Sequence, residues 1–156
     1  MVKILFVCHG NICRSPMAEF VMKNLVEKSG VAQHFEIESA AVSSEEIGNA
    51  VYPPVRRILS ANGISSEGKY ARKITSQDYR YFDLIVAMDS DNLHRIRNIC
   101  GADTDNKVCL LKKFLGNPNG EVSDPWYSGD FNTTWNEITA GCKAILTHCQ
   151  NSNFIY

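Results

Sequence analysis

The sequence predicts an α/β fold in which a parallel sheet carries helices on both faces. Short apolar runs rich in β-branched residues alternate with segments whose apolar residues recur at helical spacing. Strands that alternate with helices form crossover units, which make the strands parallel and cover both sheet faces. With 156 residues and no linker, repeat or low-complexity tract, the chain is expected to form a single domain over residues 1–156.

Four segments have the composition of strands. The first covers residues 2–8, where only Lys3 interrupts a run of apolar, β-prone side chains. The others are expected at 35–40, 83–88 and 108–111. Because the carboxyl ends of parallel strands meet at one edge of a sheet, we expect a ligand site where the first strand ends.

Helices are expected between and after these strands. For the first helix, Ser15 is the expected N-cap, Pro16 the first helical position and Gly30 the stop signal. A second helix is expected from about Pro54, with apolar residues on one face and an end at 62–63.

Two further helices follow later strands. Asp89 is interpreted as the cap of a short helix rather than as a catalytic acid. The last helix has an apolar stripe from Trp135 that includes Cys142 and Cys149, so these two cysteines are expected in the core. Loops are expected at 43–54 and 116–120.

Composition narrows the class of function. The formal net charge is -1, which argues against nucleic acid or acidic membranes as partners. The first apolar run is too short for a signal peptide or a membrane span, and no later stretch is longer. The six cysteines are therefore expected to be free thiols in a reducing cytoplasm. Separately, we expect the protein to be a monomer.

The loop from Cys8 to Ser15 carries the strongest chemical pattern. A cysteine at a strand end, before a helix N-terminus, is placed for thiolate chemistry, because the unpaired amides of the helix stabilise an anion. Gly10 lets several amides converge, Asn11 tolerates a left-handed backbone, and Arg14 can close on a phosphate with two donors. Ser15 can donate its hydroxyl to the sulfur. The expected phosphate-binding residues are His9, Gly10, Asn11, Ile12, Cys13, Arg14 and Ser15.

Each residue of this loop also has an ordinary structural interpretation. A cysteine that ends a buried strand is usually just a small hydrophobic residue. The combination of Cys8, a glycine-containing loop, Arg14 and a helix start is far less expected by accident. Cys13 lies close enough in sequence to form a reversible disulfide with Cys8 under peroxide. The histidines show no metal-ligand spacing, so no metal is expected.

The string Val7-Cys8-His9-Gly10-Asn11-Ile12-Cys13-Arg14-Ser15-Pro16 resembles the signature of the low-molecular-weight protein tyrosine phosphatase family. The resemblance implies a flavodoxin-like three-layer sandwich with a four-stranded parallel sheet. It also implies no cofactor, and hydrolysis of phosphotyrosine proteins or aryl phosphates, including acid phosphatase activity, through a cysteinyl-phosphate. Inorganic phosphate or other oxyanions would bind in the loop. Further segments that follow the family's order are 39–43, 71–75, 87–89 and 124–127.

Asp124 is the expected proton donor. A phenolate leaving group needs a proton, which a positioned carboxylic acid can deliver at neutral pH. By itself, Asp124-Pro125 is a common turn element. With the loop and the family resemblance, it becomes the candidate acid, and the same carboxylate would later take a proton from the attacking water.

Three residues are expected to form the walls of a substrate cleft. Trp126 and Tyr127 can flank a phosphotyrosine ring, with core packing as the alternative. The family usually presents an aromatic residue after its second strand, whereas this chain has Glu45 there, so one wall is expected to be acidic. Tyr52 is a candidate to replace that aromatic group.

Other functions remain open at this stage. Relatives that hydrolyse phosphoarginine carry threonine where this chain has Ile12, which favours phosphotyrosine. Arsenate-reductase relatives need a cysteine after the third strand, where this chain has Met88. A non-catalytic phosphate-binding module would need neither the nucleophile Cys8 nor the acid Asp124.

Overall fold

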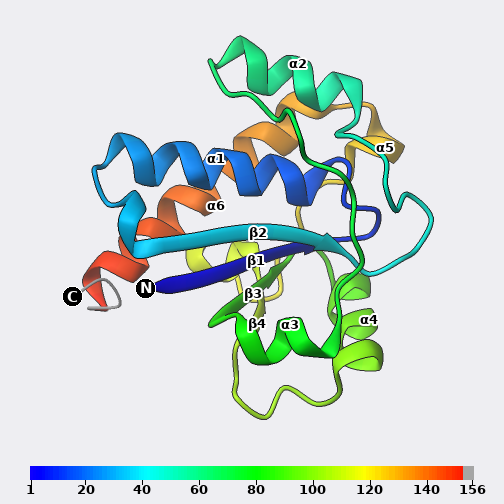
Figure 1. The fold of residues 1–156 in the computed structure, drawn as a ribbon, viewed down its shortest axis with the longest axis vertical. Coiled ribbons are helices and arrows are strands. Elements are labelled where there is room, and N and C mark those ends of the chain that lie inside the picture. The colour runs from blue at the N-terminus through cyan, green and yellow to red at the C-terminus, as the bar shows by residue number, and fades with distance from the viewer. Residues whose placement is uncertain (153–156) are drawn as a thin grey trace.

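The computed structural model describes residues 1–152, so residues 153–156 of the expected 1–156 domain lie outside the described part. It confirms a parallel sheet of four strands in the order β2-β1-β3-β4, with helices on both faces (Figure 1). Every strand pair is parallel, as the crossover units predict. The strands are β1 (Val2–Cys8), β2 (Phe35–Ala41), β3 (Leu84–Ala87) and β4 (Val108–Leu110).

The helices lie in two layers around this sheet (Figure 1). On one side, α1 packs against β1, β2 and α6; on the other, α4 packs against β3, β4 and α3. The α-helices are α1 (Arg14–Lys28), α2 (Pro53–Ala61), α3 (Ser76–Tyr81), α4 (Ser90–Cys100), α5 (Pro125–Ser128) and α6 (Phe131–Asn151), with short 3₁₀ helices at Ala32–His34 and Leu111–Leu115.

Strand β1 supplies both halves of the core. Ile4 and Phe6 are fully buried in the cluster that includes the α1 and α6 side chains. Leu5 and Val7, which point to the opposite face, are fully buried in the cluster under α3 and α4. A strand buried on both faces reads as a continuous apolar run, which is why β1 is so clear in the sequence.

The first helix begins two residues earlier than predicted. Cys13, not Ser15, is the N-cap residue, and Arg14 is the first residue of α1. Pro16 is accommodated because the amide it lacks would have no intrahelical partner in the first turn. The early start leaves the Ser15 hydroxyl free to turn toward the loop instead of capping the helix.

Helix α3 is absent from the prediction. The segment has too few apolar residues for a helical stripe, and only Tyr79 is buried. A local signal is nevertheless present: Thr75 and Asp78 form a reciprocal capping box. Capping chemistry, rather than periodicity, therefore identifies this short helix.

The strand order places the end of β1 at a switch point. The chain leaves β1 toward β2 on one side, and β3 lies on its other side. In parallel sheets, ligand sites form outside the carboxyl ends of strands at such a point. None of the helices formed by residues 1–152 is long and apolar enough to cross a membrane.

Candidate active site

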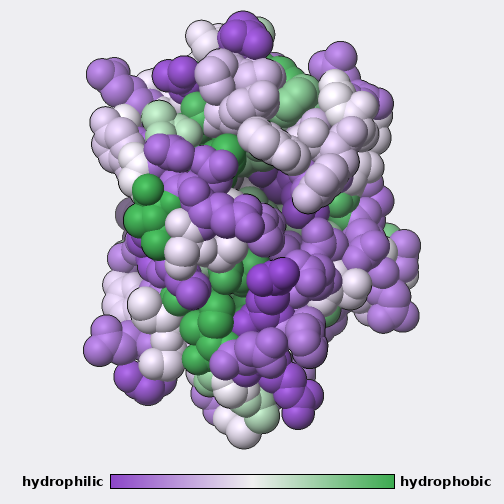
Figure 2. All heavy atoms as spheres, turned by 90° about the vertical axis from the view of Figure 1, so that its right-hand side faces the viewer, coloured by the Kyte–Doolittle hydropathy of each residue, from purple (hydrophilic) through white to green (hydrophobic). Residues whose placement is uncertain are grey.

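A cavity of about 370 Å³ opens at the carboxyl end of β1. Figure 2 shows the side of the molecule toward which α5 and the loop after β2 lie; it is mainly hydrophilic, with small separate hydrophobic areas. The site is thus bordered by polar groups rather than by one apolar surface. Its lining residues are Cys8, His9, Gly10, Ile12, Cys13, Arg14, Glu45, Glu46, Asp89, Asp91, Arg95, Asp124, Trp126 and Tyr127.

The Cys8 sulfur lies at the floor of this cavity, beside the start of α1. Its Sγ atom is 3.0 Å from the Ser15 hydroxyl and accepts a hydrogen bond from the Ser15 amide at 3.4 Å. Cys8 is only 3% exposed, yet it lines the cavity. A thiolate here is stabilised by the hydroxyl, by the amide and by the N-terminal end of a helix.

Asn11 braces the loop, as the sequence predicts. Its backbone is left-handed, with φ 60°. Its side-chain amide donates to the hydroxyls of Ser15 at 2.7 Å and Ser39 at 2.9 Å, and its oxygen accepts from the Arg72 amide at 3.1 Å. Because Asn11 is 1% exposed, these bonds are shielded from water. They fix the loop to Ser39 of β2 and to the backbone at Arg72.

The network continues through residues that the sequence does not mark as functional. The Ser39 hydroxyl donates to Glu19 at 2.6 Å, and Glu19 pairs with Lys23 at 2.6 Å and with Lys69 at 3.3 Å. Burial lowers the pKa of Lys69 below its usual value, although the charge of Glu19 opposes the shift. We call Asn11, Ser15, Ser39 and Glu19 the inner brace.

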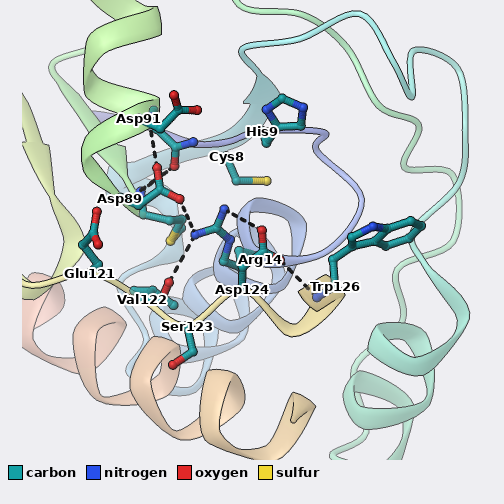
Figure 3. A network of polar contacts seen from close by, with 12 residues as sticks. Cys8, His9, Arg14, Asp89, Asp91, Glu121, Val122, Ser123, Asp124 and Trp126 are labelled. Carbon is teal, nitrogen blue, oxygen red and sulfur yellow. Dashed lines mark hydrogen bonds and ion pairs between the residues drawn. The ribbon is translucent and has the colours of Figure 1, made fainter. Parts of the chain in front are cut away.

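Arg14 forms ion pairs with two carboxylates that line the same cavity (Figure 3). Its guanidinium lies 2.8 Å from Asp89 and 3.3 Å from Asp124, and it donates to the Val122 carbonyl at 3.2 Å. Burial by itself would lower the pKa of Arg14. The neighbouring Cys8, Asp124 and Asp89 outweigh burial and raise this pKa above its usual value. Arg14 is therefore a permanent cation at 3% exposure.

The structure brings Asp124 to the same cavity from the far end of the chain. One carboxylate oxygen accepts a hydrogen bond from the Trp126 amide at 3.1 Å, which caps the short helix α5. The other oxygen faces Arg14 (Figure 3). With 26% of its side chain exposed, Asp124 remains accessible to a substrate.

Asp89 does more than the prediction assigned to it. It caps α4 by accepting from the Asn92 amide at 2.8 Å, which confirms the predicted cap. Its other carboxylate oxygen pairs with Arg14 and lines the cavity. The position two residues after β3, at the same sheet edge as Cys8, is the signal that identifies this second role.

The predicted cleft residues lie at the mouth of the cavity, and we call Glu45, Trp126 and Tyr127 the outer wall. The side chain of Glu45 is 70% exposed and bonds to His9 at 3.1 Å. Trp126 is 53% exposed and Tyr127 is 86% exposed, so core packing does not explain either residue.

Tyr52 does not replace the missing aromatic wall. It is not among the cavity-lining residues. Its ring lies behind Trp126, with the centroids 5.1 Å apart, and 6.1 Å from the ring of Phe131. Tyr52 supports Trp126 rather than facing a substrate.

All six cysteines are free thiols. Cys142 and Cys149 are buried in the α6 core, as predicted. Burial, reinforced by the nearby Cys8, raises the pKa of Cys13 to about 12, so this thiol stays protonated at neutral pH. The Cys8–Cys13 disulfide remains a prediction. Among residues 1–152, no group of three or more His, Cys, Asp or Glu side chains is arranged to hold a metal ion.

Comparison with known proteins gives a consistent result over the whole chain. The family model described as low molecular weight phosphotyrosine protein phosphatase matches residues 3–153. The low molecular weight protein-tyrosine-phosphatase YfkJ of Bacillus subtilis is 36% identical over 151 residues, covering 96% of this chain and 97% of its own. The human low molecular weight phosphotyrosine protein phosphatase is 37% identical over 153 residues and covers 92% of each chain.

Solved structures agree with the sequence matches. The crystal structure of YfkJ has a TM-score of 0.93 at 35% identity, covering 97% of this chain and 96% of that one. The crystal structure of DARP, a Drosophila arginine phosphatase, has a TM-score of 0.84 at 32% identity, covering 94% of this chain and 97% of that one.

Proposed function

The chain belongs to the low molecular weight phosphotyrosine protein phosphatase family, a family of hydrolases, and we propose that it hydrolyses phosphotyrosine through a cysteinyl-phosphate intermediate. One observation carries the proposal: the Cys8 sulfur, the Arg14 guanidinium and the Asp124 carboxylate line the same cavity. A nucleophile, a fixed cation and an acid are the groups that phosphate ester cleavage needs.

In the first step, the substrate phosphate sits over the loop that ends β1, where the amides at the start of α1 and the Arg14 guanidinium bind its oxygens. The Cys8 thiolate attacks phosphorus, and the bond from phosphorus to the tyrosine oxygen breaks. Asp124, in its protonated form, gives its proton to the departing phenolate oxygen. The products are the free phenol and phosphate bound to the sulfur.

In the second step, water replaces the phenol. The Asp124 carboxylate, now ionised, takes a proton from this water as its oxygen attacks phosphorus. The bond from phosphorus to sulfur breaks, and Cys8 leaves as a thiolate, stabilised by the Ser15 hydroxyl 3.0 Å from its Sγ atom. Inorganic phosphate is released. Because it can bind again in the same loop, it is expected to act as a product inhibitor of the enzyme.

Hydrolysis of p-nitrophenyl phosphate and of phosphotyrosine peptides at mildly acid pH tests this proposal. We expect turnover that vanadate and phosphate inhibit and that a chelator does not affect. Cys8→Ser should abolish turnover while retaining vanadate binding, because the amides and Arg14 remain. A fully active Cys8→Ser variant would falsify the mechanism, and so would loss of activity on chelation.

Phosphoarginine is the second candidate substrate, because DARP shares the fold at 32% identity. Ile12 and the exposed Trp126 at the cavity favour an aromatic ester instead. Parallel assays with phosphotyrosine and phosphoarginine peptides of the same sequence decide between the two. Faster hydrolysis of the phosphoarginine peptide would reverse the assignment.

A further inference from the structure

The position of Asp124 depends on the chain segment just before it. The Trp126 amide orients the carboxylate relative to its own backbone, and Arg14 of α1 contacts its other oxygen. These two contacts do not by themselves fix where that backbone lies. An acid that must reach a leaving-group oxygen needs both, since an error of about 1 Å in position can cost two orders of magnitude in rate.

Four hydrogen bonds to the backbone groups of Val122 and Ser123 fix this segment. The Val122 amide donates to the Met88 carbonyl at 2.8 Å, next to the end of β3, and the Val122 carbonyl accepts from Arg14 at 3.2 Å. The two backbone groups of Ser123 bond to side chains instead. Figure 3 shows the Ser123 side chain pointing away from Arg14 while Asp124 faces it.

Both partners of the Ser123 backbone come from the start of α6. The Thr134 hydroxyl donates to the Ser123 carbonyl at 2.9 Å, and the Ser123 amide donates to Glu137 at 3.1 Å. Thr134 and Glu137 are three residues apart and so lie on the same face of α6. Together they bind the amide and the carbonyl of Ser123, so α6 fixes the backbone on both sides of this residue. That residue directly precedes Asp124.

The burial and charge of these two residues show a built contact. Thr134 is fully buried. The second oxygen of Glu137 forms an ion pair with Lys112 of the 3₁₀ helix after β4. Burial raises the pKa of Glu137, but its bonds with Lys112 and Ser123 outweigh burial and leave the pKa below the usual value. Glu137 is therefore ionised at neutral pH, and its hydrogen bond from Ser123 is charge-assisted.

We propose that Thr134 and Glu137 are positioning residues for the general acid Asp124. The inference rests on the proposed function, in which Asp124 protonates the leaving group. Neither residue lines the cavity, so the contact of each with the acid runs through the backbone of Ser123. Loss of either bond lets the acid drift from the leaving-group oxygen, while the loop that binds phosphate keeps its own brace.

The test compares two substrates that differ in their need for a proton. A p-nitrophenolate leaves with little help, whereas phenolate needs the acid. We expect Thr134→Val and Glu137→Ala to lower kcat/KM about tenfold for phenyl phosphate, and at most about threefold for p-nitrophenyl phosphate. Vanadate affinity should be unchanged. Thr134→Ser and Glu137→Gln retain a donor or acceptor and should restore the wild-type ratio.

Thr147→Val is the matched control, because Thr147 donates only within α6, to the Lys143 carbonyl at 3.1 Å. It should leave the ratio between the two substrates unchanged. An equal loss on both substrates, or no loss on either, would overturn the proposal, since a purely structural role alters both rates alike. If Thr134→Val does not fold, Glu137→Ala tests the other bond to Ser123.

Asp124→Ala separates this inference from the proposed function. If that variant also loses the same factor on both substrates, Asp124 is not the acid, and the proposed function fails together with the inference. If Asp124→Ala discriminates strongly and the α6 variants do not, only the inference is wrong.

Discussion

The inner brace and the outer wall flank the same cavity but are built in opposite ways. All members of the inner brace are buried, and each bonds to the next through polar side chains. The outer wall consists of exposed side chains with few fixed partners. Buried polar bonds fix geometry, because breaking them costs far more than breaking exposed ones. We infer that the inner brace sets the chemistry, and the outer wall sets the choice of substrate.

The largest expected effect tests whether the inner brace contributes to stability. Glu19→Ala leaves Lys69, whose side chain is only 12% exposed, without its carboxylate partner, so we expect the free energy of unfolding to fall by about 3 kcal/mol. Urea denaturation measures the change. The exposed Glu67 provides the control: Glu67→Ala should change stability by at most about 0.5 kcal/mol. Equal effects of the two substitutions would remove the distinction between the brace and the surface.

A smaller effect is expected at the aromatic part of the outer wall. Trp126→Ala removes a ring that can stack on the substrate, worth about 1 kcal/mol, so KM for a phosphotyrosine peptide should rise roughly fivefold. The inhibition constant of inorganic phosphate should stay constant, because phosphate does not reach the wall. A parallel rise in both constants would show that Trp126 shapes the loop instead.

The smallest effect is expected at Glu45. Its exposed carboxylate, held by His9, places negative charge near an anion site. We expect Glu45→Gln to raise kcat/KM for p-nitrophenyl phosphate about twofold at low ionic strength, with the gain lost in high salt. Glu67→Gln should show no such gain. A decrease in kcat/KM would mean that the bond to His9 matters more than the charge.

Parts of the site with a local pattern could be predicted from the sequence. Cys8 and Arg14 belong to one glycine-containing loop between a strand and a helix start, and this combination indicates an anion site. Asp124 needed the family resemblance, because Asp-Pro alone indicates only a turn. For Trp126, the sequence left two interpretations open, a substrate wall or core packing. The structure excludes core packing, because Trp126 is exposed.

Long-range side-chain partners could not be predicted in this way. Glu19 and Lys69 are 50 positions apart, and neither has a neighbour in sequence that marks it as buried. Thr134 and Glu137 look like ordinary polar residues of an amphipathic helix. Only the packing of α6 beside the segment before Asp124 gives them a partner.

The sequence by itself determined the strands, their parallel direction and the loop that ends β1, because hydrophobic periodicity and backbone preferences act between near neighbours in the chain. The tertiary structure decided which carboxylates face Arg14, which distant cation pairs with Glu19 and which helix holds Ser123. Those contacts depend on how strands and helices pack in three dimensions, and burial then turns ordinary charges and hydroxyls into fixed partners.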